Sequence, residues 1–128
     1  MKKIFFFLCA ASLLCSCAGN KAEQTAESFL TNYLNMDYDA AAAYCDSTVA
    51  FSLRIASEGW QELDSALLVK IREASSSTRY EIVEIDDQSV KNEAHVSYLL
   101  YPMNSENGVE MSMTLVKEKG RWLVRSLR

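Results

Sequence analysis

The stretch VEMSMTLVKEKGRWLVRSL, residues 109–127, decides the fold. Apolar side chains alternate with mostly polar ones from Val109 to Leu115, which is the period of two expected of a half-buried strand. KEKG, 117–120, supplies a tight turn, and RWLVRSL, 121–127, resumes a strand pattern. The C-terminal part of the chain therefore predicts an antiparallel hairpin with one apolar face.

Two more strands are predicted upstream of this hairpin. RYEIVEID, 79–86, again alternates, and EAHVSYLLYPM, 93–103, reads as a long strand. NSENG, 104–108, is rich in turn-forming residues and connects the long strand to the next one. Together these segments predict an antiparallel sheet of about four strands.

The residues before the sheet predict three helices. Residues 22–35 carry an apolar stripe with a period of 3.6 residues, and 36–46 form a shorter alanine-rich helix capped by Asp37 or Asp39. VAFSL, 49–53, is short and favours a β-strand, and the pattern of 57–74 predicts the third helix. Helices followed by antiparallel strands define an α+β domain.

This order resembles the NTF2-like cone, in which three N-terminal helices pack on a curved antiparallel sheet. The resemblance is carried by AESFLTNYLNMDYDAAAAYC, EAHVSYLLY and LVKEKGRWLVRSL, and it covers residues 23–128. It is strongest to the small lipoprotein-borne members of the DUF4878 and lumazine-binding-like type. The resemblance implies a conical cavity that is open at one end.

The N-terminus has the pattern of a secretory signal peptide over residues 1–16. Lys2 and Lys3 precede the nearly continuous apolar run 4–14, and small residues follow it. Eleven helical residues reach only about 16 Å, whereas a membrane span needs to cross roughly 30 Å. We therefore expect an export signal rather than a membrane span.

LLCSC, 13–17, resembles a bacterial lipobox, which implies that Cys17 is lipidated and becomes the mature N-terminus. Residues 17–22 would then form a lipidated tether. An ordinary signal peptide cleaved nearby, for example after Ala18, is the alternative. Ala18 in the position after the cysteine implies sorting to the outer membrane, with the domain facing the periplasm. In both cases we expect an envelope protein.

The charge balance after the signal is acidic. All 17 Asp and Glu residues and 11 of the 13 Lys and Arg residues follow Cys17, which leaves a net charge of −6. An acidic domain repels phosphate backbones, so nucleic acid is not an expected partner. The net charge also gives no reason to expect that the folded surface binds anionic lipids.

No arrangement of residues indicates catalysis or a cofactor. The single histidine, His95, lies in the long predicted strand, and no motif brings an aspartate to it. One histidine and one unmodified cysteine, Cys45, cannot supply a closed zinc site. Cys45 is expected to pack as a small apolar side chain. The predicted metal and cofactor content is therefore none.

Aromatic and methionine side chains are the candidate lining of the cavity. Aromatic residues with polar tips suit a pocket that holds an apolar ligand, although they suit an ordinary core equally well. The candidate pocket residues are Tyr98, Trp122, Met111, Met113, Tyr33 and Trp60.

Three functional hypotheses follow. The first is an anchored lipoprotein domain that binds a small apolar ligand or a partner protein without catalysis. The second is an enzyme of the isomerase or dehydratase type that uses a pocket carboxylate or His95. The third is a structural homodimerisation module that pairs through its sheet face.

Overall fold

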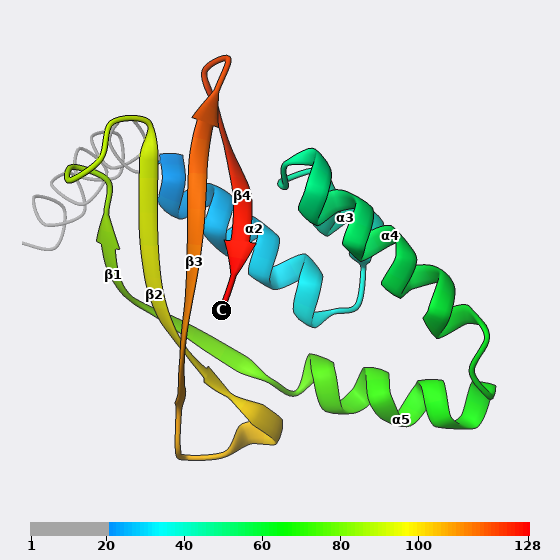
Figure 1. Cartoon of the computed structure of the whole chain (residues 1–128). Helices are drawn as coiled ribbons and strands as arrows, with labels where there is room; N and C mark the ends of the chain where they lie inside the picture. Colours follow the sequence, from blue (N-terminus) through cyan, green and yellow to red (C-terminus); the bar gives the residue numbers. More distant parts are fainter. Residues whose placement is uncertain (1–20) are drawn as a thin grey trace, which may run out of the picture.

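The protein is described here by a computed structural model, which covers residues 21–128. An antiparallel sheet has helix α2 packed against one face, and α3, α4 and α5 extend from that layer (Figure 1). The helices are α2 Lys21–Leu34, α3 Tyr38–Ala42, α4 Ser47–Gln61 and α5 Ser65–Ser76; the strands are β1 Arg79–Asp86, β2 Glu93–Tyr101, β3 Val109–Glu118 and β4 Arg121–Leu127. The short 3-10 helix η1, Pro102–Asn104, follows β2. The predicted α+β class is confirmed.

Helix α2 forms where the apolar stripe predicted it. Ala22, Ala26, Phe29 and Leu30 are its buried residues and face the sheet. The helix ends at Leu34, and Met36, two residues further on, adopts a φ of 59°. The N–H groups of Met36 and Asp37 donate to the carbonyls of Tyr33 and Asn32, which is the hydrogen-bond pattern of a Schellman cap. This cap turns the chain sharply into α3.

Aspartates start the next two helices. The Asp37 carboxylate accepts a hydrogen bond from the Ala40 N–H at 3.3 Å, and the Asp46 carboxylate accepts one from the Val49 N–H at 2.9 Å. The prediction of a strand at 49–53 is therefore wrong, because these residues form the first half of α4. The N-cap at Asp46 and the burial of Ala50 and Leu53 outweigh the β-propensity of Val49 and Phe51.

The predicted helix 57–74 is in fact parts of two helices. Helix α4 ends at Gln61, and α5 begins at Ser65 with Asp64 as its N-cap. The apolar stripe from which one helix was predicted continues across the break. The stripe alone therefore does not show that two helices are present. The described part of the chain consequently has four α-helices where three were predicted.

The four strands pair in the order β1-β2-β3-β4, each antiparallel to the next. The β3–β4 hairpin closes through Lys119 and Gly120, both with positive φ, as a tight two-residue turn requires. Two register shifts mark β-bulges. Val83 is the extra residue of β1 opposite β2, and Arg125 is the extra residue of β4 opposite β3. Both β1 and β4 are edge strands, so the sheet is open rather than closed into a barrel.

The core lies between the inner face of the sheet and α2, α3 and α4. Its largest fully buried side chains are Phe29, Met113, Leu115, Val96 and Val124. No polar or charged residue is buried among residues 21–128. Alternation along β2 places Ala94, Val96 and Tyr98 inside and His95 and Ser97 outside.

The predicted signal peptide and most of the tether lie outside the described residues. Helix α2 begins at Lys21, so Lys21 and Ala22 of the predicted tether 17–22 are already helical. No helix within residues 21–128 combines the length and the apolar character needed to cross a membrane.

Candidate functional site

A hollow of about 220 Å³ lies between the helices and the inner face of the sheet, and we call it the inner pocket. Helices α2, α3 and α5 and strands β2, β3 and β4 all contribute to its wall. Its lining residues are Leu30, Tyr33, Leu34, Tyr38, Ser75, Leu100, Met111 and Leu127. The lining is apolar and aromatic, with three hydroxyl groups and no charged side chain.

Local periodicity brings these side chains together. Leu30, Tyr33 and Leu34 lie three and four residues apart, so they share one face of α2. Leu100 shares the inner face of β2 with Tyr98, which pairs directly with Met111 on β3. The wall is closed at the end of α5, where the Ser75 hydroxyl donates to the Leu34 carbonyl at 2.6 Å.

Edge-to-face contacts hold the aromatic side of the inner pocket. The rings of Phe29 and Tyr33 have centroids 5.4 Å apart at 66°, and those of Tyr33 and Tyr38 are 5.4 Å apart at 70°. Burial raises the pKa of Tyr38, while the neighbouring Trp60 lowers it in part. The Tyr38 hydroxyl therefore keeps its proton at neutral pH and can donate a hydrogen bond.

Tyr98 lies beneath this aromatic group, on the inner face of β2. Its side chain is 4% exposed, so it faces inward. Burial, with a smaller contribution from Tyr33, raises the pKa of Tyr98 to about 12. Such a tyrosine remains neutral across the physiological range.

The six candidate pocket residues are distributed over several places. Tyr33 and Met111 line the inner pocket, and Met113 is packed solidly in the core. Trp122 lines a different hollow, beside the start of α2. Trp60 lies on α4, outside the lining of the inner pocket, close enough to Tyr38 to lower the pKa of that tyrosine in part.

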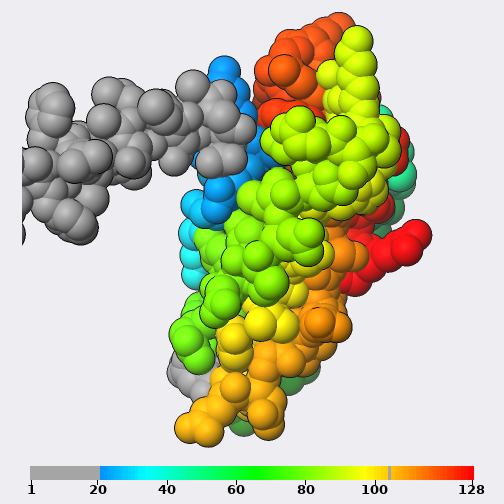
Figure 2. Space-filling view, turned by 90° about the vertical axis from the view of Figure 1, so that its left-hand side faces the viewer, coloured from blue at the N-terminus to red at the C-terminus, as the bar shows by residue number. Residues whose placement is uncertain are grey.

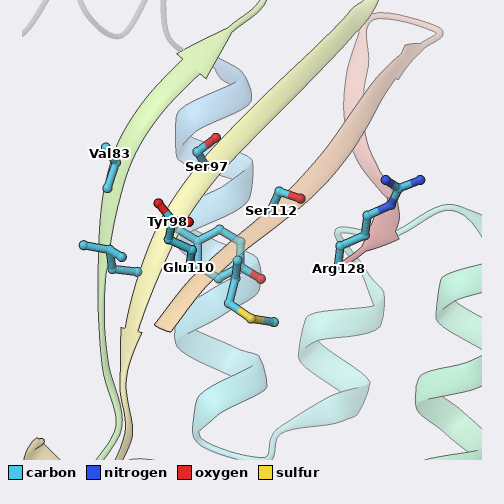
Figure 3. A pocket seen from close by; sticks show the side chains of 8 residues that line it. Val83, Ser97, Tyr98, Glu110, Ser112 and Arg128 are labelled. Atoms are coloured by element: carbon cyan, nitrogen blue, oxygen red, sulfur yellow. The ribbon is translucent and has the colours of Figure 1, made fainter. Parts of the chain in front are cut away.

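A second hollow, of about 320 Å³, lies over the middle of the sheet (Figure 3). It includes Ser97 and Ser112, together with Glu110 and Arg128. Backbone hydrogen bonds between Ser112 and Arg128, at 2.8 and 3.1 Å, extend the β3–β4 pairing to the last residue. This outer hollow is a shallow surface of mixed polar and apolar character, because Val83, Leu99 and two of the candidate pocket residues, Tyr98 and Met111, also line it.

His95 also lies on the outer face and is remote from the inner pocket. Its Nε2 is 3.2 Å from the Glu93 carboxylate, and its Nδ1 is 3.3 Å from the Thr114 hydroxyl. Glu93 also contacts Arg125 at 3.3 Å. No group of three or more potential metal ligands occurs within residues 21–128. These contacts describe a solvated surface network.

Cys45 is a free, buried thiol. Its sulfur donates to the Ala41 carbonyl at 3.3 Å, and burial raises its pKa to about 12. The side chain therefore packs as a small apolar group, as expected. Cys17, the predicted site of lipidation, lies outside the described residues.

Comparison with known structures shows the fold. A crystal structure of a protein from Campylobacter jejuni, provisionally described as an NTF2-like transpeptidase, has a TM-score of 0.59 to this chain. It is 18% identical and covers 84% of this chain and 99% of its own. The fold is therefore NTF2-like, and at this identity the likeness shows the fold alone. No family model and no curated protein matches the sequence.

Several lining residues were not among the candidates predicted from the sequence. They are Leu30, Leu34, Tyr38, Ser75, Leu100 and Leu127. The leucines belong to ordinary amphipathic patterns. Such a pattern does not distinguish a residue that lines a pocket from one that is packed in the core. Tyr38 carried a signal, since it directly follows the capping Asp37 of a short helix and stands near Tyr33 in the chain.

Proposed function

We propose that this chain is an envelope lipoprotein, anchored through Cys17, whose domain binds a small apolar ligand without catalysis. The observation that supports ligand binding is the inner pocket itself. Its wall is apolar except for the hydroxyls of Tyr33, Tyr38 and Ser75. Pockets for small molecules commonly have this composition, with a few polar groups that orient the ligand.

The dimensions of the inner pocket restrict the ligand. About 220 Å³ is below the roughly 300–1,000 Å³ typical of pockets for drug-sized molecules. The ligand is therefore a compact apolar compound with one hydrogen-bond acceptor. That acceptor would meet the Tyr38 hydroxyl, which burial keeps protonated.

The proposed anchor and location rest on the sequence. A lipobox-like LLCSC after a short apolar run favours acylation of Cys17, and two or more acyl chains hold a protein on a membrane durably. Ala18 favours the outer membrane, facing the periplasm. The likeness to lipoprotein-borne DUF4878 and lumazine-binding-like domains remains part of this proposal.

The enzyme alternative receives less support. An isomerase needs a base that faces the bound substrate. The inner pocket has neither a carboxylate nor a histidine in its wall, and His95 lies on the opposite face of the sheet. Catalysis of this kind would require a movement of the helices that brings a carboxylate into the inner pocket.

For the homodimer alternative, an interface on α4 is better supported than one on the outer face of the sheet. The outer face of the sheet carries His95, Ser97 and Ser112, whereas a stable dimer interface has a mostly apolar centre. Helix α4 exposes Phe51 and Ile55 four residues apart, at 62% and 53%. Sedimentation of wild type and the Phe51→Ser variant distinguishes the cases: a dimer that dissociates in the variant supports this alternative.

Ligand binding is tested with an apolar fluorescent probe, N-phenyl-1-naphthylamine, added to the purified lipoprotein in a non-micellar amphipol. Leu34→Phe narrows the inner pocket, and Leu67→Phe makes the same change on the exposed surface of α5. We expect Leu34→Phe to weaken probe binding at least tenfold and Leu67→Phe to leave it unchanged. Equal effects of the two variants would refute the inner pocket as the site.

Native mass spectrometry of the protein extracted from membranes identifies any retained ligand. The anchor is tested separately by Cys17→Ser, which should release the protein from the membrane fraction. Membrane attachment that persists in the variant would exclude Cys17 as the anchor. Ligand binding and anchoring can therefore fail independently.

A further inference from the structure

One end of the molecule combines the start of α2 with the turn between β3 and β4. Both lie at the top of the view in Figure 1, and the rotated view in Figure 2 places them at the same end. A hollow of about 300 Å³ lies between them, and we call it the corner hollow. It is lined by Lys21, Gln24, Thr25, Ser28, Tyr44, Gly120, Arg121 and Trp122.

The corner hollow has the composition of an anion site. Its charged side chains are Lys21 and Arg121, its hydroxyls and amide can donate hydrogen bonds, and no carboxylate lines it. Arg121 is held in place because its Nη2 donates to the Ala43 carbonyl at 3.3 Å. Arginine in a fixed orientation suits the recognition of phosphate oxygens.

Two more cations stand beside the corner hollow. The Lys117 ammonium lies 6.0 Å from the centre of the Trp122 ring, and Lys119 occupies the turn itself. Lys21, Lys117, Lys119 and Arg121 together form what we call the basic corner. Glu118 is the acidic side chain of the same turn. Four of the 11 basic residues that follow Cys17 thus gather on a domain whose net charge is −6.

The basic corner is also the part of the domain nearest to the proposed anchor. Only three residues, 18–20, separate Cys17 from Lys21, and the four Cα–Cα steps from Cys17 to Lys21 span at most about 14 Å when fully extended. Electrostatic attraction at physiological salt extends over about 8 Å. The tether therefore allows Lys21 and the rest of the basic corner to approach the lipid headgroups to within the range of electrostatic attraction.

We propose that the basic corner binds anionic phospholipid headgroups of the membrane that carries the anchor, with one phosphate in the corner hollow. This inference rests on the proposed lipid anchor at Cys17. Binding orients the domain, because Leu34 and Ser75 of the inner pocket belong to the C-terminal ends of α2 and α5, and both ends lie away from the β3–β4 turn (Figure 1). The inner pocket would consequently open toward the periplasm rather than the bilayer.

The test uses the mature lipoprotein reconstituted into vesicles of brominated phosphatidylcholine, with or without 30% phosphatidylglycerol. A Trp60→Phe background leaves Trp122 as the only tryptophan, and bromine quenches tryptophans near the bilayer. We expect Trp122 to be quenched at least twofold more strongly in the anionic vesicles. High salt should abolish the difference.

Charge variants identify the residues responsible. Lys119→Gln with Arg121→Gln should remove the extra quenching, whereas Lys70→Gln with Arg72→Gln makes the same charge change on exposed α5 and should retain it. If the first variant unfolds, Lys117→Gln with Lys119→Gln replaces it in the experiment, because this pair of changes keeps the Arg121–Ala43 hydrogen bond. Equal loss in the α5 variant would overturn the proposal, because net charge alone would then explain it.

Two further arms separate the remaining outcomes. Inorganic phosphate at 10 mM without vesicles tests the other source: if it changes Trp122 fluorescence while anionic vesicles give no extra quenching, the corner hollow is a site for free phosphate and the headgroup proposal is refuted. Vesicle flotation reports the anchor: wild type that fails to float with either vesicle refutes the anchoring and this inference with it. Wild type that floats with both but is quenched equally refutes only this inference.

Discussion

Cys45 pairs with Val124 in an isolated parallel bridge that attaches the α3–α4 connection to the edge of the sheet. The Val124 N–H donates to the Tyr44 carbonyl at 2.8 Å, and the Asp46 N–H donates to the Val124 carbonyl at 2.9 Å. The bridge buries the Cys45 side chain and also positions Asp46 as the N-cap of α4. The four-residue connection between α3 and α4 thus links the sheet to the helices.

The Cys45 thiol should be unreactive in the folded protein. Its pKa is raised to about 12 by burial and, to a smaller extent, by Asp46, whereas an unfolded cysteine has a pKa of about 8.5. We expect Ellman's reagent at pH 8 to react at least 100-fold faster in guanidinium than in buffer. One thiol per denatured chain is expected if Cys17 carries the proposed thioether, and two would contradict lipidation.

The same shift predicts an alkaline loss of stability. The folded state holds the thiol proton more tightly than the unfolded state, so unfolding releases protons above pH 8.5. The free energy of unfolding should therefore fall as pH rises from about 8.5 toward 12. Cys45→Ala should reduce this slope, as measured by denaturant titrations at pH 7.5 and 10. An unchanged slope would show that other groups cause it.

Two phenylalanines should differ sharply in their contribution to stability. Phe29 is 1% exposed in the core, and Phe51 is on the surface of α4. Phe29→Ala should lower the free energy of unfolding by about 3–5 kcal/mol, because it removes apolar contacts and leaves a cavity. Phe51→Ala should change it by less than about 0.5 kcal/mol. Urea unfolding followed by circular dichroism measures both, and similar costs would contradict the assigned core.

Two glycines form a second matched pair. Gly120 has a φ of 78° in the β3–β4 turn, and Gly59 lies within α4 with open space around its Cα. Gly120→Ala should destabilise the protein by about 1 kcal/mol or more, since L-residues disfavour this conformation. Gly59→Ala should stabilise it by about 0.5–1 kcal/mol through helix propensity. Thermal unfolding of both variants tests whether stability falls for Gly120→Ala and rises for Gly59→Ala. Stabilisation by Gly120→Ala would exclude the positive φ at this position of the β3–β4 turn.

Asp86 should titrate at an unusually low pH. Its pKa is lowered chiefly by the Ser89 hydroxyl, at 2.7 Å, and then by the backbone N–H groups of Ser89 and Gln88. Because the folded pKa lies below the unfolded value, the stabilisation is present above the unfolded pKa and is lost as pH falls through the folded one. Ser89→Ala should raise the Asp86 pKa in carboxyl-carbon NMR titrations, and Ser97→Ala should leave it unchanged. Equal values in wild type and Ser89→Ala would refute this hydrogen bond.

The strands were predictable because their pattern is local. A period of two over 79–86 and 109–116 is hard to produce by chance, and both segments form strands close to the expected bounds. The helix bounds were less predictable, since apolar runs extend across each boundary. Asp46 caps α4 through its side chain, whereas Asp64 occupies the N-cap position of α5 without a side-chain hydrogen bond. Closer attention to the aspartates would have located both starts.

The candidate site was only partly predictable. Tyr33 and Met111 do line the inner pocket, but Met113, two residues from Met111 on the same strand face, is packed in the core. Which of two such residues borders a cavity depends on where α2 crosses the sheet and where the end of α5 meets α2. That crossing arises from contacts distant in sequence, such as the hydrogen bond between Ser75 and Leu34.

The bridge between Cys45 and Val124 has a consequence for self-assembly. It occupies part of the β4 edge, so within residues 21–128 the β1 edge is the longer run of unpaired backbone groups. A second copy would therefore find its longer pairing surface along β1, and pairing there would join two sheets edge to edge. The partial cover of β4 shortens the backbone template on the opposite edge.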